Sequence, residues 1–165
     1  MNKSLRKIEL KFISTLSIML KDFWSTQLYE ASDQDILEDI GRMLSPKSFA
    51  RLILYKDEVA GFIFAYDKYG YVNNIEYLFI KKEFRDKGLG SFAIKEAMKS
   101  ILEKGNPRVQ IEVSINNVKA LKLYHKLGFK YIDTLSLSTS LPGKTKKIIF
   151  KDLEFLANPK EEFKE

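Results

Sequence analysis

The spacing of hydrophobic residues changes early in the chain, which predicts a strand followed by a helix. Ile8, Leu10 and Phe12 alternate with Glu9 and Lys11, as expected of a strand with one buried face. Over residues 14–30 the hydrophobic residues instead recur at three- and four-residue intervals, which favours an amphipathic helix.

A second helix and three strands are predicted next. Ser32 is followed three residues later by Asp35, a spacing typical of a helix N-terminus, and Ser45 with Pro46 marks the end of that helix. Hydrophobic segments with short polar turns between them then cover residues 49–56, 59–67 and 72–81. Three such segments in succession predict an antiparallel meander.

The second half of the chain alternates helices with strands. A helix is predicted from Gly88 to residues 105–107, because Leu89, Ala93, Ala97 and Ile101 share one face. The elements predicted after it are a strand at residues 109–113, a helix at 117–127, and strands at 129–138 and 144–153 around Pro142 and Gly143. This order indicates an α/β protein with a mixed sheet, in a single domain over residues 1–165 with a frayed tail at 158–165.

The composition of the chain limits which ligands, catalytic groups and metal sites are possible. The 28 Lys and Arg residues against 22 Asp and Glu give a net charge of +6, which fits an anionic ligand, nucleic acid, a membrane surface or simply a solvated basic surface. There is no cysteine and His125 is the only histidine, so disulfides, a cysteine nucleophile and a multi-histidine metal site are excluded, and we expect no metal.

The N-terminal segment "FISTLSIML" has the hydrophobicity of a signal peptide but not its organisation. Glu9 and Lys11 interrupt the residues before it, no small-residue cleavage site follows, and Lys21 with Asp22 ends the run. We therefore expect a cytoplasmic protein with no membrane partner.

The stretch "RDKGLGSF", residues 85–92, predicts an anion site. Glycines between a strand and a helix expose backbone N–H groups at the helix N-terminus, where a pyrophosphate is favoured, and Arg85 and Lys87 add positive charge. The alternative is that Gly88 and Gly90 only permit tight helix–strand packing. The spacing matches neither the Walker pattern nor the three-glycine dinucleotide fingerprint.

Two blocks of sequence resemble the GNAT superfamily of N-acetyltransferases. "YLFIKKEFRDKGLGSFAIKEAM" is similar to the acetyl-CoA loop of that family, although Lys82 and Asp86 depart from its usual residues. "IEVSINNVKALKLYHKLGFK" is similar to the strand and helix that follow it. The residues that recur there in family order are Glu112, Val113, Asn117, Ala120, Tyr124, Gly128 and Phe129.

The resemblance implies a mixed, mostly antiparallel central sheet with helices on both faces, splayed between strands 72–81 and 108–114 to admit acetyl-CoA. Backbone of Leu78, Phe79 and Ile80 would pair with the pantetheine arm. Asn117 and Tyr124 would line the arm from the other side. The pyrophosphate would lie on the amides of Arg85, Asp86, Lys87, Gly88, Leu89, Gly90 and Ser91.

Acetyl transfer to an amine needs a base and an acid. An amine with a pKa of about 10.4 is protonated at pH 7, so its proton must be removed before it attacks, and a thiolate leaves more easily when it is protonated. Glu76 and Glu112 are candidate bases, with His125 a lesser one, and Tyr124 is the candidate acid. The alternatives are that the glutamates are rim carboxylates paired with a lysine and that Tyr124 is a packed aromatic. The resemblance supports Glu112 and Tyr124, which stand twelve residues apart.

The acceptor is predicted to enter from the opposite side of the sheet, walled by the two N-terminal helices, with Trp24, Tyr29 and Glu30 as candidate contacts. It could be a small amine, a polyamine, an aminoglycoside or a peptide or protein N-terminus, and the protein a monomer or homodimer. Because the chain has no cysteine, we expect direct transfer within a ternary complex. The first alternative is a non-catalytic acyl-CoA-binding module. The second is a nucleic-acid-binding domain, but a basic aromatic stripe is missing and we expect no nucleic-acid partner.

Overall fold

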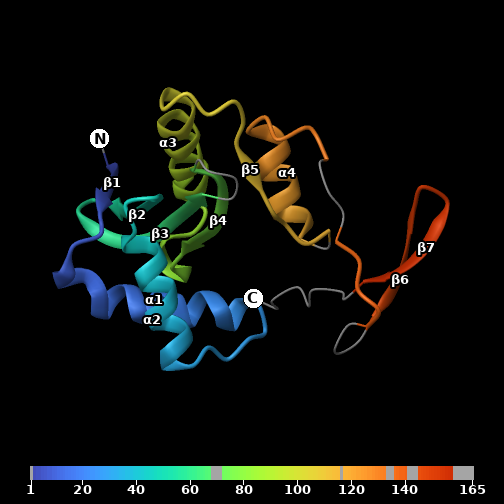
Figure 1. Cartoon of the computed structure of the whole chain (residues 1–165), viewed down its shortest axis with the longest axis horizontal. Coiled ribbons are helices and arrows are strands. Elements are labelled where there is room, and N and C mark those ends of the chain that lie inside the picture. Colours follow the sequence, from blue (N-terminus) through green and yellow to red (C-terminus); the bar gives the residue numbers. More distant parts are fainter. Residues whose placement is uncertain (1, 68–71, 116, 133–135, 141–144, 158–165) are drawn as a thin grey trace. The chain divides into compact units, whose positions relative to one another are not determined.

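The computed structural model describes residues 2–67, 72–115, 117–132, 136–140 and 145–157 (Figure 1). The chain divides into two compact units, Met1–Glu112 and Val113–Glu165, and each is described by itself. The prediction of one domain over residues 1–165 stays a prediction.

A five-stranded sheet forms the centre of the first unit. Its strands, in spatial order, are β1 (Lys3–Lys7), β2 (Ser48–Tyr55), β3 (Glu58–Asp67), β4 (Val72–Ile80) and β5 (Gln110–Ile111). The first four pair antiparallel and only β5 runs parallel to its neighbour β4. The predicted mixed, mostly antiparallel sheet is confirmed.

Helices cover both faces of this sheet. Helices α1 (Ile13–Thr26) and α2 (Asp33–Leu44) lie on one face, and α3 (Leu89–Glu103) lies on the other (Figure 1). The core below the sheet joins buried side chains of both helices to alternate residues of the central strands: Leu16, Met19, Leu20, Ile36, Ile40 and Met43 with Leu52, Leu54, Phe62, Phe64, Tyr77 and Phe79. Burial of these residues removes most of their hydrophobic surface from water and fixes the two helices on the sheet.

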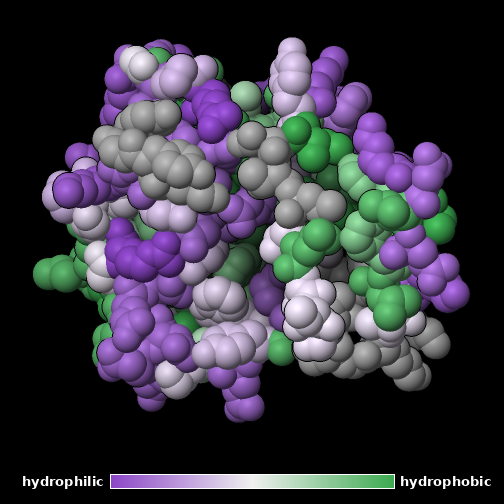
Figure 2. Space-filling model, turned by 45° about the vertical axis from the view of Figure 1, so that its right-hand side comes forward, coloured by the Kyte–Doolittle hydropathy of each residue, from purple (hydrophilic) through white to green (hydrophobic). Residues whose placement is uncertain are grey.

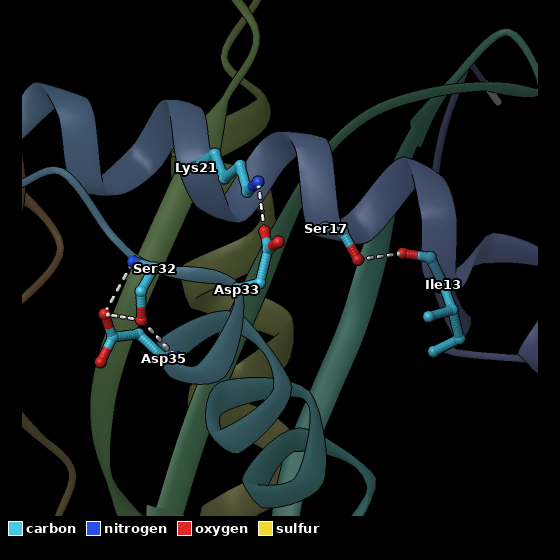
Figure 3. Close-up of polar contacts among 6 residues, drawn as sticks. All are labelled: Ile13, Ser17, Lys21, Ser32, Asp33 and Asp35. Carbon is cyan, nitrogen blue, oxygen red and sulfur yellow. Dashed lines mark hydrogen bonds and ion pairs between the residues drawn. The ribbon is translucent and has the colours of Figure 1, made fainter.

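Helix α2 begins where the sequence predicts. Ser32 Oγ accepts a hydrogen bond from the Asp35 amide (3.2 Å), and Asp35 Oδ2 accepts one from the Ser32 amide (2.8 Å), which completes a capping box (Figure 3). Lys21 of α1 forms an ion pair with Asp33 (2.6 Å) across the two helices. Polar contacts thus fix the start of α2 and join it to α1.

The N-terminal strand lies earlier than predicted. Residues 3–7 pair with β2, from Lys3↔Tyr55 to Lys7↔Arg51, while the segment predicted as a strand contains a 3-10 turn at Leu10–Phe12. The strand at residues 3–7 was missed because β1 lies at the edge of the sheet. Its charged residues suit an exposed edge, but they do not give the hydrophobic alternation from which a strand was predicted at residues 8–12. Helix α1 also ends at Thr26, short of residue 30, because Leu28 adopts a left-handed conformation (φ 60°).

The strand predicted at residues 109–113 is reduced to the two residues of β5.

The second unit contains α4 (Val118–Lys126) and a hairpin of β6 (Lys146–Phe150) and β7 (Leu153–Ala157). Of the closing strands predicted at 129–138 and 144–153, only Lys146–Phe150 of the second is confirmed, as β6. The described part of 129–138 is not strand, and the hairpin turns at Lys151 and Asp152, whose φ angles of 52° and 61° suit a two-residue hairpin turn. Pro142, Gly143 and the tail at 158–165 lie outside the described residues.

Hydrophobic side chains also reach the surface (green in Figure 2). In the second unit these include Ile149, Leu153 and Leu156 of the hairpin. Among the helices that the structure describes, none is both long and hydrophobic enough to span a membrane.

Candidate active site

The sheet opens at a bulge in β4. Ile75 pairs with Ala65 and Tyr77 pairs with Phe64, so Glu76 is an extra residue with no partner in β3. The parallel ladder to β5 has its last pair at the same point, Ile75↔Ile111. Bulges of this kind bend a strand and end its pairing. Beyond Ile75, β4 continues to Ile80 without a partner in β5.

The opened part of β4 contains the backbone that the sequence assigns to pantetheine. Leu78, Phe79 and Ile80 pair on their other side with Ile63, Phe62 and Gly61 of β3. Gly61 allows the two strands to approach closely, because a Cβ there would overlap the Phe79 carbonyl oxygen. On the side of β5, the edge of β4 beyond Ile75 has the strand geometry needed to pair with an extended ligand.

The loop after β4 leads into α3 through a glycine with a left-handed backbone. Gly88 is the N-cap of α3 with φ 69° and makes no side-chain cap, and the first helical bond runs from the Phe92 amide to the Gly88 carbonyl (3.1 Å). The amides of Leu89, Gly90 and Ser91 therefore have no acceptor within the helix. A Cβ at Gly90 would meet only the Leu78 side chain at 3.6 Å. This arrangement suits an anion at the helix N-terminus.

Three cations surround this loop, and one of them was not predicted. The Lys3 ammonium of β1 lies 3.1 Å from the position that a Cβ on Gly88 would occupy. Arg85 Nε donates to the Ile80 carbonyl (3.2 Å), and Lys87 Nζ donates to the Glu83 carbonyl (2.5 Å). Sequence patterns could not reveal Lys3, since its place depends on the contact between β1 and α3. Asp86 is exposed, with a φ of 58° that aspartate tolerates better than most residues.

Glu76, one of the two candidate bases, is held in an ion pair. Its Oε2 accepts a hydrogen bond from Arg42 Nη2 of α2, and Arg42 Nη1 also donates to the Tyr77 hydroxyl (3.2 Å). The Arg42 guanidinium lies over the Tyr66 ring at 5.0 Å and the Phe64 ring at 5.2 Å. Glu76 therefore fits the alternative that this glutamate is a rim carboxylate paired with a basic residue, although the partner is an arginine and not a lysine.

A buried carboxylate connects this ion pair to α1. Asp39, only 6% exposed, accepts hydrogen bonds from the Tyr77 hydroxyl (2.9 Å) and from Trp24 Nε1 (2.8 Å), and it lies 3.5 Å from Arg42. Burial raises the pKa of Tyr77, and the Glu76 and Asp39 carboxylates raise it further. The sequence could have indicated Asp39, although it was not singled out there. This carboxylate falls on the hydrophobic face of α2 beside Ile36, Ile40 and Met43.

A pocket of about 270 Å³ opens beside Asp39. It is lined by Trp24, Tyr29, Asp35, Glu38, Asp39 and Arg42 and is called the Trp24 pocket below. Two of the three predicted acceptor contacts, Trp24 and Tyr29, line it. Glu30 is exposed and is not among the lining residues.

The remaining candidates lie at or after the end of the first unit. Glu112 follows β5 directly and is exposed. In the second unit, Asn117 caps α4, since its Oδ1 accepts the Ala120 amide (3.3 Å). Tyr124 packs edge-on against Phe129 with ring centroids 6.1 Å apart, and burial raises its pKa. His125 is exposed.

The described part of the chain has no group of three or more histidine, cysteine, aspartate or glutamate side chains that could hold a metal ion. The expectation that the protein needs no metal stays a prediction.

Comparison with protein families identifies the class. The acetyltransferase (GNAT) family matches residues 14–129, so the chain belongs to this family. The family assignment predicted from the two sequence blocks is confirmed.

Solved structures share the fold at low sequence identity. An aminoglycoside N-acetyltransferase, AAC(6')-Iy, in complex with CoA is 18% identical, with a TM-score of 0.70 over 84% of this chain and 94% of that one. The PaiA N-acetyltransferase of Thermoplasma acidophilum, also in complex with CoA, is 23% identical, with a TM-score of 0.64 over 81% and 93%. A possible acetyltransferase of Clostridium difficile 630 is 16% identical, with a TM-score of 0.69 over 87% and 100%.

Proposed function

We propose that the protein transfers an acetyl group from acetyl-CoA directly to a primary amine. The observation that supports this most strongly is the adjacency of two features in the first unit. Strand β4 has no partner in β5 beyond Ile75, and it leads directly into the loop where Gly88 exposes the first amides of α3. One extended ligand with a pyrophosphate at its end fits both features.

The residues of this segment fit acetyl-CoA by their chemistry. Backbone of Leu78, Phe79 and Ile80 would pair with the pantetheine amides, and the amides from Arg85 to Ser91 would hold the pyrophosphate. Lys3, Arg85 and Lys87 supply the positive charge that two phosphates need. Asn117 would add a contact through its side-chain Nδ2, since its Oδ1 caps α4. When bound, acetyl-CoA supplies the thioester carbon that the amine attacks.

Glu112 is the proposed base. It would accept a proton from the acceptor ammonium, directly or through water, and leave a neutral nitrogen able to form the new C–N bond. Glu76 is the weaker candidate because Arg42 stabilises its ionised form and occupies one of its oxygens.

Tyr124 is the proposed acid. As the C–S bond breaks, the tyrosine hydroxyl would donate its proton to the departing sulfur. Burial raises the Tyr124 pKa above the ordinary value, so the hydroxyl keeps its proton throughout the neutral range. The same proton is then recovered from solvent before the next turnover.

A kinetic experiment tests the proposal. Release of the CoA thiol is followed with acetyl-CoA and a panel of amines, and the initial rates are measured while both substrates are varied. Direct transfer predicts intersecting reciprocal plots, whereas an acetyl-enzyme would give parallel ones. A non-catalytic acyl-CoA-binding module would bind CoA in a calorimetric titration but release no thiol with any amine.

A further inference from the structure

The Trp24 pocket is negatively charged in a protein that is positive overall. Three carboxylates, from Asp35, Glu38 and Asp39, line it together with a single guanidinium, although the whole chain has a net charge of +6. A local charge of this sign favours a cationic ligand and repels an anionic one such as CoA.

The positive charge of Arg42 does not neutralise the pocket. Its guanidinium is paired with Glu76, bonds to Tyr77 and lies over the rings of Phe64 and Tyr66. Glu76 is not among the residues that line the pocket, so it offsets Arg42 from outside. Among the described residues, two of the lining carboxylates bond to neutral donors only: Asp35 to Tyr29 and Ser32, and Glu38 to Gln34.

Two aromatic rings form a corner of the pocket. The Trp24 and Tyr29 rings are 5.4 Å apart at 70°. Asp39 fixes the Trp24 indole through its N–H, and Asp35 accepts a hydrogen bond from the Tyr29 hydroxyl (3.0 Å). Aromatic faces attract ammonium groups, and rings held in place by hydrogen bonds lose little freedom when the ligand arrives.

An open carboxylate oxygen completes the site. Gln34 Nε2 donates to Glu38 Oε1 (3.0 Å), and among the described residues no donor bonds to Glu38 Oε2. The Asp39 oxygens, by contrast, are occupied by Trp24 and Tyr77. Glu38 is therefore the carboxylate best able to bond directly to a ligand ammonium.

We infer that the Trp24 pocket binds a second, non-reacting ammonium group of the acceptor, so that the preferred acceptors are diamines or longer polyamines. This inference rests on the proposed acetyl transfer. Carboxylates and aromatic faces stabilise the charged form of an amine, whereas the attacking nitrogen must be neutral. The pocket is thus suited to hold one amino group while another reacts.

The position of the pocket agrees with this role. Arg42 lines the pocket and also binds Glu76, the residue at which β4 loses its β5 partner. One guanidinium therefore joins the cation site to the opened edge of β4. An acceptor with two separated amino groups could occupy the pocket and still extend toward that edge.

The single tryptophan of the chain gives a test that does not depend on activity. Trp24 fluorescence is measured during titration with 1,4-diaminobutane and, as an uncharged control of the same length, 1,4-butanediol. We expect the diamine to change the fluorescence with saturation and the diol to have no effect. The diamine affinity should fall roughly fivefold in Glu38→Gln, as expected for loss of one partly exposed charge contact, and stay unchanged in the matched α3 variant Glu96→Gln.

Steady-state kinetics test the specificity. We expect kcat/KM for 1,4-diaminobutane to exceed that for 1-aminobutane by about tenfold or more, because only the diamine can fill the pocket and react at once. Glu38→Gln should raise KM for the diamine while kcat changes little, and should leave the values for 1-aminobutane near those of the wild type.

The outcomes separate the two proposals. Equal kcat/KM for the diamine and the monoamine, or a diamine KM unaffected by Glu38→Gln, would overturn the inference and leave acetyl transfer intact. A fluorescence change without acetylation of any amine would support the cation site and contradict acetyl transfer. Unchanged Trp24 fluorescence with the diamine would overturn the inference whatever the activity.

Discussion

Arg42 of α2 binds Glu76, the extra residue of the β4 bulge. The contact links a helix on one face of the sheet to the point where β4 loses its β5 partner. Alternation along a regular strand would place Glu76 with Leu78, away from α2. The bulge changes that alternation, so the carboxylate is paired and is less available as a base.

The two candidate bases should therefore behave differently when neutralised. We expect Glu112→Gln to lower kcat/KM mainly near pH 7 and to recover in part as pH rises toward the amine pKa of about 10.4, because free amine then needs no base. Glu76→Gln should leave the shape of the pH profile unchanged and lower the free energy of unfolding by about 1 kcal/mol through loss of the Arg42 contact. The reverse pattern in the pH–rate profiles would identify Glu76 as the base.

Gly88 tests the anion site. In Gly88→Glu the new side chain would start 3.1 Å from the Lys3 ammonium, on a backbone with φ 69°, and bring negative charge to the phosphate position. We expect a folded protein without measurable CoA binding in a calorimetric titration. Gly105→Glu is the matched control, since Gly105 also has a positive φ (84°) but open space around it. Unchanged CoA affinity in folded Gly88→Glu protein would show that the pyrophosphate binds elsewhere.

Lys3 tests a contact that only the structure reveals. Lys3→Met should weaken CoA binding roughly fivefold, as expected for loss of one charge-assisted phosphate contact, and should make the affinity less dependent on salt. Lys7→Met, at the exposed other end of β1, should change neither quantity. If both variants bind CoA equally well at low salt, Lys3 does not contact the phosphates.

Much of the fold followed from local patterns, and the failures have identifiable causes. The capping box at Ser32 and the meander of β2, β3 and β4 are local, so periodicity and turn residues predicted them. The β6–β7 hairpin was not predicted, because its turn at Lys151 and Asp152 contains neither glycine nor asparagine. The turn predicted at Pro142 and Gly143 lies outside the described residues.

In the candidate site, too, only the features that lie within a short stretch of sequence could be predicted. The glycine loop could be predicted because its chemistry lies within a few consecutive residues. The pairing of Arg42 with Glu76 and the approach of Lys3 to Gly88 could not, since each joins residues far apart in the chain. Such contacts depend on strand order and on one bulge, neither of which leaves a local sequence pattern.

Two glycine substitutions should change stability in opposite directions. In Gly61→Ala the Cβ would overlap the Phe79 carbonyl oxygen, so we expect the free energy of unfolding to fall by about 2 kcal/mol or more. Gly41→Ala, in α2 with open space around it, should instead raise it by about 0.5–1 kcal/mol through helix propensity. Urea denaturation measures both. A neutral Gly61→Ala would mean that β3 and β4 separate readily.

A substitution at Tyr124 tests whether its hydroxyl is the general acid. Removal of its hydroxyl in Tyr124→Phe should leave the urea midpoint and the CoA dissociation constant nearly unchanged but lower kcat about 100-fold, within the range of general acid catalysis. Because burial raises the Tyr124 pKa, ionisation of this group should not reduce wild-type kcat until the pH exceeds about 10. A wild-type kcat in the variant would make Tyr124 a packing residue, and a loss of CoA affinity would make it a binding residue.

The most direct test of acetyl transfer is product identification by mass spectrometry. The protein is mixed with acetyl-CoA and 1,4-diaminobutane, and the amine, CoA and protein are analysed from the same reaction. We predict one acetylated amine for each CoA released, an unmodified protein, and no product from folded Gly88→Glu. Saturable CoA binding with no acetylated product from any amine in the panel would contradict the account.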